Sequence, residues 1–270
     1  MIQADYFVVT MLRNARVDAH YPSIVGQYVH KPREDRIMQY YGFRGENSTF
    51  VGQSNDRVMI WASGSQAHYV ARTLKTDIAD SYSVARMDLQ VTVTSLDADY
   101  WIECIQPAKV YKATKVVNLN EKGTTLYVGA PTSNIRLRVY NKTAESGIAP
   151  DGGGEYVRFE IQCRNQYADK AFVALRNNMA RSFYLMVLKR MVDGYTYKLV
   201  EGAIRTAEEE LFTDDFPSSK DDPISRKKRW LEQSVFPALR RLLVEDKEYV
   251  DSFINRLYNG DNDADNGDMY

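Results

Sequence analysis

Apolar and polar residues alternate most strictly between Thr125 and Arg164, and this alternation predicts strands of an antiparallel sheet. The segments TLYVGA, NIRLRVYNK and EYVRFEIQCR repeat with a period of two, as expected when one face of a strand is buried and the other is open. The segment ARMDLQVTV, residues 85–93, repeats in the same way. The loop from Thr143 to Gly154 is rich in glycine, and we expect it to be a mobile hairpin tip.

The polar positions of these strands place guanidinium, carboxylate, amide and phenol groups on one surface. They are Arg86, Asp88, Gln90 and Thr92, then Arg136, Arg138, Tyr140 and Lys142, then Arg158, Glu160, Gln162 and Arg164. Antiparallel sheets often turn a polar face to water, so a solvated surface is one interpretation. A site in which Tyr140 lies between cations and faces a carboxylate is the other. Strands disfavour aspartate, so Asp88 needs an explanation, and surface placement and metal ligation both stay open.

The pattern predicts further elements towards the N-terminus. It favours a strand at Tyr6–Leu12, an irregular segment at 13–35, a hairpin that turns at Ser54–Asp56 and a helix at Gln66–Ala79. The lysine-bearing segment after these elements, with Lys109, Lys112 and Lys115, is expected to be a solvated edge or to contact phosphates.

From about Asp169 the apolar spacing becomes helical. A first helix carries an apolar stripe that we expect to face the core, and a second follows at Lys198–Phe212. The stripe consists of Leu175, Met179, Phe183, Met186 and Met191. Strands followed by helices predict an α+β fold: a central antiparallel sheet with an open polar face, packed on helices and followed by a C-terminal helical region.

Composition divides the chain into three parts. Residues 1–213 hold the sheet and its helices and form the domain with the open polar face. The segment DDFPSSKDDPIS, residues 214–225, has the composition of a linker and opens a predicted helical segment at 214–258. Residues 259–270 form an acidic tail that we expect to be disordered.

Charge is distributed unevenly, although the net charge of the 270 residues is only −1. Residues 245–270 carry eight acidic residues and two basic ones, a net of −6. The remainder therefore has 33 basic and 28 acidic residues, a net of +5. A run of four basic residues, Arg226, Lys227, Lys228 and Arg229, precedes Trp230. Such a run is usually solvated, but beside an aromatic residue it also suits contact with a phosphate backbone.

Cysteine and histidine usage argues against several kinds of site. The two cysteines, Cys104 and Cys163, form no CxxC motif, and the three histidines are scattered, so neither a disulfide framework nor a zinc site is indicated. Any metal would be a hard cation held by oxygen ligands. No run of about 18 apolar residues and no signal-peptide pattern is present, so we expect no membrane contact and a cytoplasmic location.

Several segments, in order, resemble the replication initiation factor family. They are ASGSQAH at 62–68, VARMDLQVTV at 84–93, TLYVGAPTSNIRLRVYNKTAES at 125–146, EYVRFEIQCR at 155–164 and RKKRWLEQ at 226–233. The family comprises rolling-circle initiators of plasmids and phages that lack a histidine-pair metal motif, with related relaxases of integrative elements. The resemblance spans roughly residues 40 to 235.

The resemblance implies roles for residues that match the family's motifs. Its Arg-x-Tyr-x-Lys strand corresponds to Arg138, Tyr140 and Lys142, which would be catalytic. Its acidic positions correspond to Asp88 and Glu160, which would bind Mg²⁺ or Mn²⁺. The family commonly has an acid four residues after the first aspartate, where this chain has Thr92. The third ligand is therefore open between Gln90, Gln162 and Glu145, and we take Gln162 as the candidate.

The implied activity is metal-dependent, sequence-specific nicking and religation of one DNA strand, with Tyr140 forming a 5′-phosphotyrosyl link and releasing a 3′-OH primer. Arg138 and Lys142 are expected to lower the phenol pKa of about 10. The DNA-binding candidates are Arg86, Arg136, Arg158, Arg226, Lys227, Lys228 and Arg229. Tyr127 is the second choice for the nucleophile.

The resemblance also implies partners. They are an origin with a single-stranded or hairpin nick site, a host helicase and a second copy of the chain. Two alternatives remain: a relaxase that nicks a transfer origin by the same chemistry, and a non-catalytic nucleic-acid-binding protein in which Tyr140 only stacks.

Overall fold

The computed structural model describes residues 2–117, 123–151 and 153–210, with side chains as far as residue 206. The fold described below belongs to one compact unit, Met1–Ala207. Within the described residues, no helix is long and apolar enough to cross a membrane.

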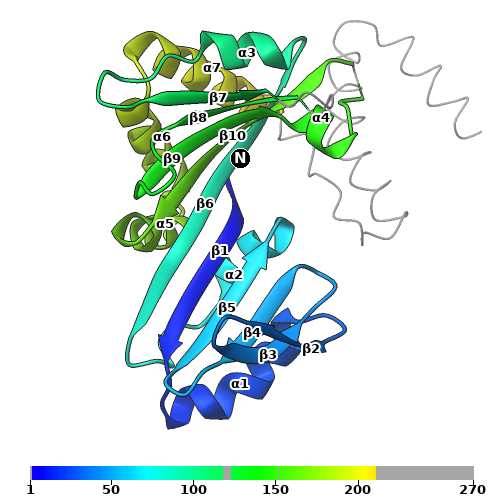
Figure 1. Ribbon diagram of the computed structural model, residues 1–270, viewed down its shortest axis with the longest axis vertical. Helices are drawn as coiled ribbons and strands as arrows, with labels where there is room; N and C mark the ends of the chain where they lie inside the picture. The colour runs from blue at the N-terminus through cyan, green and yellow to red at the C-terminus, as the bar shows by residue number, and fades with distance from the viewer. Residues whose placement is uncertain (1, 118–122, 152, 211–270) are drawn as a thin grey trace, which may run out of the picture. The chain divides into compact units, whose positions relative to one another are not determined.

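Ten strands of the described residues form one antiparallel sheet. They are β1 Gln3–Leu12, β2 Arg33–Ile37, β3 Tyr40–Arg44, β4 Thr49–Gln53, β5 Arg57–Ser63, β6 Tyr82–Ser95, β7 Ala113–Val117, β8 Thr124–Val128, β9 Ile135–Asn141 and β10 Glu155–Arg164. Their order across the sheet is β2-β3-β4-β5-β1-β6-β10-β9-β8-β7. The long strand β6 pairs with β1 on one side and β10 on the other, and it therefore joins the two halves of the sheet (Figure 1).

The helices are α1 Ala15–Tyr28, α2 Ser65–Thr73, α3 Ala98–Cys104, α4 Lys142–Ser146, α5 Gln166–Arg176, α6 Ala180–Met191 and α7 Gly194–Glu210. Of these, α2, α3, α5 and α6 pack on the central strands. This arrangement confirms the predicted α+β fold with a central antiparallel sheet packed on helices.

The apolar face of the sheet forms the main core with these helices. Phe7 of β1 stacks on Phe172 of α5 with ring centroids 5.3 Å apart, and Trp101 of α3 meets Phe159 of β10 edge to face at 5.6 Å. The Tyr184 hydroxyl of α6 donates a hydrogen bond to the Phe159 carbonyl oxygen at 3.1 Å. The helices therefore cover one face of the central strands, and the polar positions of β6, β9 and β10 lie on the other.

A second, smaller apolar cluster lies at the β2–β5 end of the sheet. It consists of Tyr40, Phe50 and Met59, with Val8, Ile37 and Trp61 packed against it. Two glycines leave room for close packing here. Gly42 allows β3 to approach β4, because a Cβ at this position would lie 2.0 Å from the Val51 carbonyl oxygen. At Gly52 a Cβ would lie 2.5 Å from the Phe50 ring.

The structure corrects the prediction that residues 13–35 are irregular. Helix α1 occupies 14 of these 23 residues, although Pro22 lies inside the helix. Asn14 caps the helix, because its side chain accepts a hydrogen bond from the Val17 amide at 2.8 Å. Val17, Ile24 and Tyr28 are buried and hold one side of the helix to the fold. The burial of this face outweighs the hydrogen bond that the proline cannot make.

Two further predictions about the later elements are wrong in detail. Lys142 does not continue the preceding strand, which ends at Asn141; it begins the short helix α4, and Asn141 caps that helix through the Ala144 amide. The apolar stripe does not run along one helix either. Asn178 has φ +57° between α5 and α6, and the break leaves Met179 and Met186 more than half exposed.

The second predicted helix begins earlier than expected, since α7 starts at Gly194. The predicted domain at 1–213 stays a prediction. The helical segment at 214–258 and the acidic tail at 259–270 lie outside the described residues.

The close packing at Gly42 gives a test of the fold. Gly42→Ala should lower the free energy of unfolding by about 1–3 kcal/mol, because the new methyl group overlaps the β4 backbone. Gly26→Ala, at an exposed position of α1 with open space around it, should raise it by about 1 kcal/mol. Urea denaturation of both variants measures the difference, and equal stabilities would contradict the described β3–β4 packing.

Candidate functional site

A pocket of about 320 Å³ opens on the polar face of the sheet, around β1, β6, β9 and β10. Eight of its lining residues were predicted from the sequence: Arg86, Asp88, Arg138, Tyr140, Lys142, Arg158, Glu160 and Gln162. The other five are Asp5, Tyr6, Ser63, Gly64 and Glu145, of which the sequence indicated only Glu145, as an alternative metal ligand. Residues from segments more than seventy positions apart therefore meet in one place.

Strand register explains why these side chains meet. Asp88 of β6 lies opposite Gln162 of β10 on one side and Tyr6 of β1 on the other. One step along β10, Glu160 lies opposite Arg138 of β9. Residues opposite each other in an antiparallel pair point to the same face, so the polar sets of four strands form one surface.

Asp88 is a buried carboxylate held by a guanidinium. Its side chain is only 1% exposed, and it accepts hydrogen bonds from Arg86 Nε at 2.9 and 3.1 Å. Burial raises the pKa of Asp88 to about 7, although the hydrogen bond from Arg86 acts in the opposite direction. The nearby Glu160 carboxylate raises the pKa further. A carboxylate with this pKa changes its protonation state near neutral pH.

Glu160 is the second buried carboxylate, with 3% exposure. Gln162 Nε2 donates a hydrogen bond to Glu160 Oε1 at 3.0 Å, and Arg138 Nη1 lies 3.7 Å from Glu160 Oε2. Burial raises the pKa of Glu160 in spite of these partners. Both acids are thus partly stripped of water and electrostatically coupled, a state that a bound cation would relieve.

Tyr140 lines the pocket but is only 4% exposed. The Arg138 guanidinium lies over its ring, 3.9 Å from the centroid. Burial raises the pKa of the phenol above its ordinary value, Arg158 and Arg138 lower it, and Glu160 and Glu145 raise it. Arg138 thus lowers the pKa of the phenol as expected, whereas Lys142 is not among the groups that shift it. Loss of water outweighs the cations, so the net shift of the pKa is upward.

Lys142 and Arg138 share a carboxylate that comes from α4. Lys142 Nζ lies 2.5 Å from one Glu145 oxygen, and Arg138 Nη2 lies 3.7 Å from the other. Glu145 is 41% exposed, so its charge is held at the solvent side of the pocket. The Asn141 cap positions this pair, because it fixes where α4 begins.

Asp5 enters the pocket through a β-bulge that the sequence did not reveal. Ala4 lies opposite Leu89 and Tyr6 opposite Asp88, so Asp5 is the extra residue of β1. Arg158 Nη1 lies 3.5 Å from Asp5 Oδ1. The predicted strand began at Tyr6, and an alternation pattern gives no signal for a bulge one residue earlier.

Thr92 stands where the family commonly has an acid, and it contacts a cation. Its hydroxyl accepts a hydrogen bond from Arg158 Nε at 3.1 Å. Of the three candidates for a third ligand, Gln162 and Glu145 line the pocket. Gln90 lies opposite Glu160 on the same face, and its buried Oε1 has no hydrogen-bond partner among the described residues.

Arg136, a further DNA-binding candidate, does not line the pocket. Arg136 is on β9 with its guanidinium 3.7 Å from the Tyr127 ring centroid, and its buried Nε has no hydrogen-bond partner within the part of the chain that the structure describes. Burial lowers the pKa of Arg136. The basic residues at 226–229 lie outside the described residues.

Among the described residues, no three histidine, cysteine or acidic side chains are grouped closely enough to hold a metal ion by themselves. Two buried carboxylates and an amide still suit a hard cation. Mg²⁺ commonly keeps several waters and takes only one or two protein carboxylates together with substrate phosphate oxygens. The donor set therefore fits a partly hydrated Mg²⁺ or Mn²⁺.

The fold and the pocket define an α+β protein with a charged, tyrosine-containing site on the open face of its sheet. The sequence model of the family described as "Replication initiation factor" matches residues 74–210, just over half of the chain. The chain belongs to the replication initiation factor family. The matched residues include all eight predicted pocket residues and exclude β1, which supplies Asp5 and Tyr6.

A solved structure supports the same fold. The rolling circle replication initiator protein from Geobacillus stearothermophilus is 14% identical and has a TM-score of 0.54. The similarity covers 86% of this chain and 95% of that one. At this identity the likeness concerns the fold. No curated protein matches the chain.

The buried Asp88 gives a pH test. Its folded pKa lies above the unfolded value, so its stabilising contribution is complete below pH 4 and is lost as the pH rises through about 7. Without divalent cations, the free energy of unfolding should therefore fall by up to about 4 kcal/mol over this range. Asp88→Asn should reduce this fall and leave only the part that comes from Glu160, whose pKa burial also raises. Urea denaturation at a series of pH values measures the difference.

Asp18→Asn serves as the control, because Asp18 is 43% exposed and pairs with Arg13 at 2.8 Å on the surface. This variant should keep the fall in stability. If the free energy of unfolding of Asp88→Asn falls with pH as much as that of the parent, ionisation of Asp88 does not destabilise the fold.

Proposed function

We propose that this protein is a rolling-circle replication initiator that nicks and reseals one DNA strand at an origin through a covalent bond to Tyr140. The observation that supports it best is the convergence of the family-matched residues from β6, β9 and β10 in one pocket. The family and the likeness to a rolling circle replication initiator protein support the same function.

Covalent catalysis suits a reaction that must later be reversed. In the proposed step the Tyr140 oxygen forms a bond to the scissile phosphorus while the bond to the 3′-oxygen breaks, and the 3′-oxygen takes up a proton. The phosphodiester energy is kept in the tyrosyl link, whereas attack by water would lose it. The product is a 5′-phosphotyrosyl strand and a free 3′-OH.

The raised pKa of Tyr140 means that the phenol must lose its proton as it attacks. Glu145 interacts electrostatically with the phenol and is the candidate acceptor for that proton. Arg138 over the ring and Arg158 would stabilise negative charge on the phosphate and on the phenolate.

Charge balance supports a divalent cation as cofactor. The pocket lining contains four cations, Arg86, Arg138, Lys142 and Arg158, and four carboxylates, Asp5, Asp88, Glu145 and Glu160. A scissile phosphate adds a negative charge to this balanced set. Asp88, Glu160 and Gln162 would hold Mg²⁺ or Mn²⁺, which acts as a Lewis acid for the phosphate oxygens.

The same balance argues against a pure binding module. Burying Asp88 and Glu160 on a surface that meets phosphates lowers both stability and affinity unless the carboxylates take part in the chemistry. The partner is then origin DNA, with the nick site single-stranded so that a phosphate reaches the pocket. A host helicase and a second copy of the chain are proposed from the family resemblance alone.

The nucleophile is tested by Tyr140→Phe. Incubation of the variant with supercoiled origin DNA and Mg²⁺ should give no covalent protein–DNA adduct on denaturing gels, while its DNA affinity stays within about twofold of the parent, because the phenyl ring fills the same space. Tyr127→Phe is the control and should form adducts as the parent does. Adducts with the Tyr140 variant would assign the nucleophile elsewhere.

The metal site is tested without any cleavage assay. Mn²⁺ at a hundredfold excess over its Kd should stabilise the parent by about 2.7 kcal/mol, which raises Tm by about 5–10 °C for a chain of this size. Asp88→Asn and Glu160→Gln should lose this shift. Glu103→Gln, an exposed acid paired with Lys115, should retain it. An unchanged shift in both site variants would place the cation elsewhere.

A further inference from the structure

Cationic and aromatic side chains form a row that leaves the pocket on its β1 side. The Arg86 guanidinium lies 4.3 Å from the Tyr6 ring centroid, and Tyr6 meets Trp61 edge to face at 5.9 Å. The Arg44 guanidinium lies 5.0 Å from the Trp61 ring centroid on the far side. The row therefore consists of two aromatic rings in contact with each other, with one guanidinium at each end.

Strand register places all four side chains on one face. Val8 of β1 lies opposite both Arg86 of β6 and Trp61 of β5. Trp61 lies opposite Phe50 of β4, which lies opposite Arg44 of β3. The row thus crosses five neighbouring strands, β6, β1, β5, β4 and β3, on the face that carries the pocket.

All four side chains of the row are partly exposed, so a ligand can contact them. The side chains of Arg86 and Arg44 are 30% and 26% exposed, and Tyr6 and Trp61 are half-buried. A guanidinium that lies over a ring turns its other planar face outwards, where a flat group can stack. Asp88 and Asp35 fix the orientations of the two arginines through ion pairs.

We propose that this row, Arg86–Tyr6–Trp61–Arg44, is a binding platform for single-stranded DNA next to the scissile phosphate. Stacking of bases on aromatic rings and guanidinium planes, with phosphates near cations, is how proteins hold single strands without reading sequence. The inference rests on the proposed function for its starting point, since it takes the pocket to receive a DNA phosphate.

The length of the row suits a short single strand. Four steps between adjacent strands, at about 4.8 Å each, span about 19 Å. At about 3.4 Å per stacked nucleotide this is room for about five nucleotides. Duplex DNA would not use the row in this way, because its bases hide their planar faces. Arg33, opposite Arg44 on β2, extends the positive charge at the far end.

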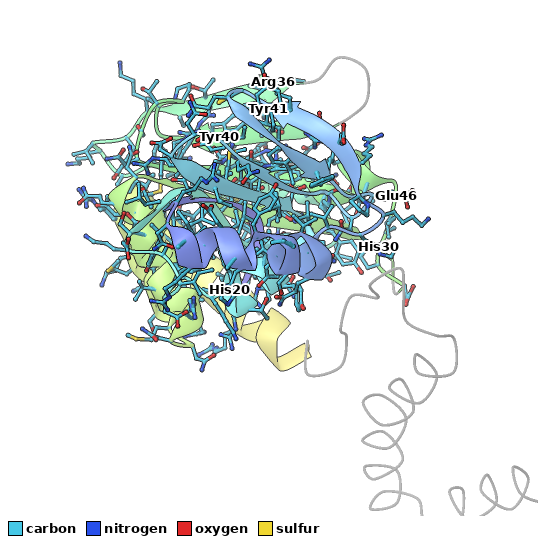
Figure 2. All side chains as sticks on the ribbon, turned by 90° about the horizontal axis from the view of Figure 1, so that it is seen from below. His20, His30, Arg36, Tyr40, Tyr41 and Glu46 are labelled. Carbon is cyan, nitrogen blue, oxygen red and sulfur yellow. The ribbon has the colours of Figure 1, made fainter. Side chains whose placement is uncertain are left out.

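The fold contains a matched control on the other face of the same strands. Arg36 of β2 lies over the Tyr41 ring of β3, 4.6 Å from its centroid. Tyr41 alternates with Tyr40 and so points away from the side of β3 that carries Arg44. Figure 2 shows Arg36 and Tyr41 beside each other at the edge of the sheet. This pair has the same chemistry but no link to the pocket.

The experiment measures binding of fluorescein-labelled dT12 to the full chain by anisotropy, in EDTA and with Tyr140→Phe so that cleavage cannot contribute. Trp61→Leu and Arg44→Gln should each raise Kd about tenfold. Tyr41→Leu and Arg36→Gln should change Kd less than about twofold. In Trp61→Leu, the leucine side chain still fills apolar space against the cluster of Tyr40, Phe50 and Met59. Thermal melts check that each variant is folded.

An abasic 12-mer separates stacking from charge. The parent should bind it about tenfold more weakly than dT12, whereas Trp61→Leu should lose little further affinity, because its stacking partner is already absent. Arg44→Lys, which keeps the charge but not the plane, should bind dT12 more weakly than the parent and provides a second variant if Trp61→Leu does not fold.

Equal Kd values for the parent, Trp61→Leu and Arg44→Gln would overturn the platform, as would an equal loss in the Tyr41 and Arg36 variants. Tighter binding of a 12-mer duplex or of U12 than of dT12 would also overturn it. The binding experiment does not depend on nicking. If Trp61→Leu and Arg44→Gln raise Kd but the parent forms no covalent adduct, only the proposed function is refuted. If the parent forms the adduct but Trp61→Leu does not change Kd, only the platform is refuted.

Discussion

The pairing of β6 with both β1 and β10 is the constraint on which the site depends. This strand alone joins the two halves of the sheet, and its register sets Asp88 between Tyr6 and Gln162. A shift of one residue along either neighbour would turn the polar set towards the helices and the apolar set towards water. The core and the site are thus specified by the same hydrogen-bonded register, because Met87 and Leu89 are fully buried on the opposite face.

The site departs from what stability alone would favour. Asp88 and Glu160 are almost fully buried and are held by arginines that are themselves partly buried. Burial raises the pKa of both carboxyls, and the Glu160 charge raises the pKa of Asp88 further. Replacing such groups by apolar residues often stabilises a fold. Their presence is explained if the pocket receives a divalent cation together with a phosphate, since the carboxylates would bind the cation and the arginines would bind the phosphate. Burial also raises the pKa of Tyr140, so the phenol stays neutral until a phosphate is bound.

Local patterns were sufficient to predict the central strands and the face on which each side chain lies. Leu137 and Phe159 are fully buried and Asp88 and Tyr140 lie on the polar face, as their period-two spacing indicated. Helix α1 was missed because Pro22 was taken as a loop signal, although Asn14 carried a capping signal. The stripe through Met179 failed because a break at Asn178 changes the phase of the helix. Long-range pairing could not be predicted: nothing in the sequence near Asp5 or Trp61 shows that β1 lies between β5 and β6.

The central claim is that the phosphate is transferred to the phenol at the centre of this pocket. Mass spectrometry of the nuclease-trimmed, protease-digested adduct tests it most directly, because the residual nucleotide marks the attacking residue. We predict that the nucleotide is carried by the peptide containing Tyr140 and is bonded to that tyrosine. A nucleotide on Tyr127, on Tyr6 or on any residue outside the pocket would contradict the account.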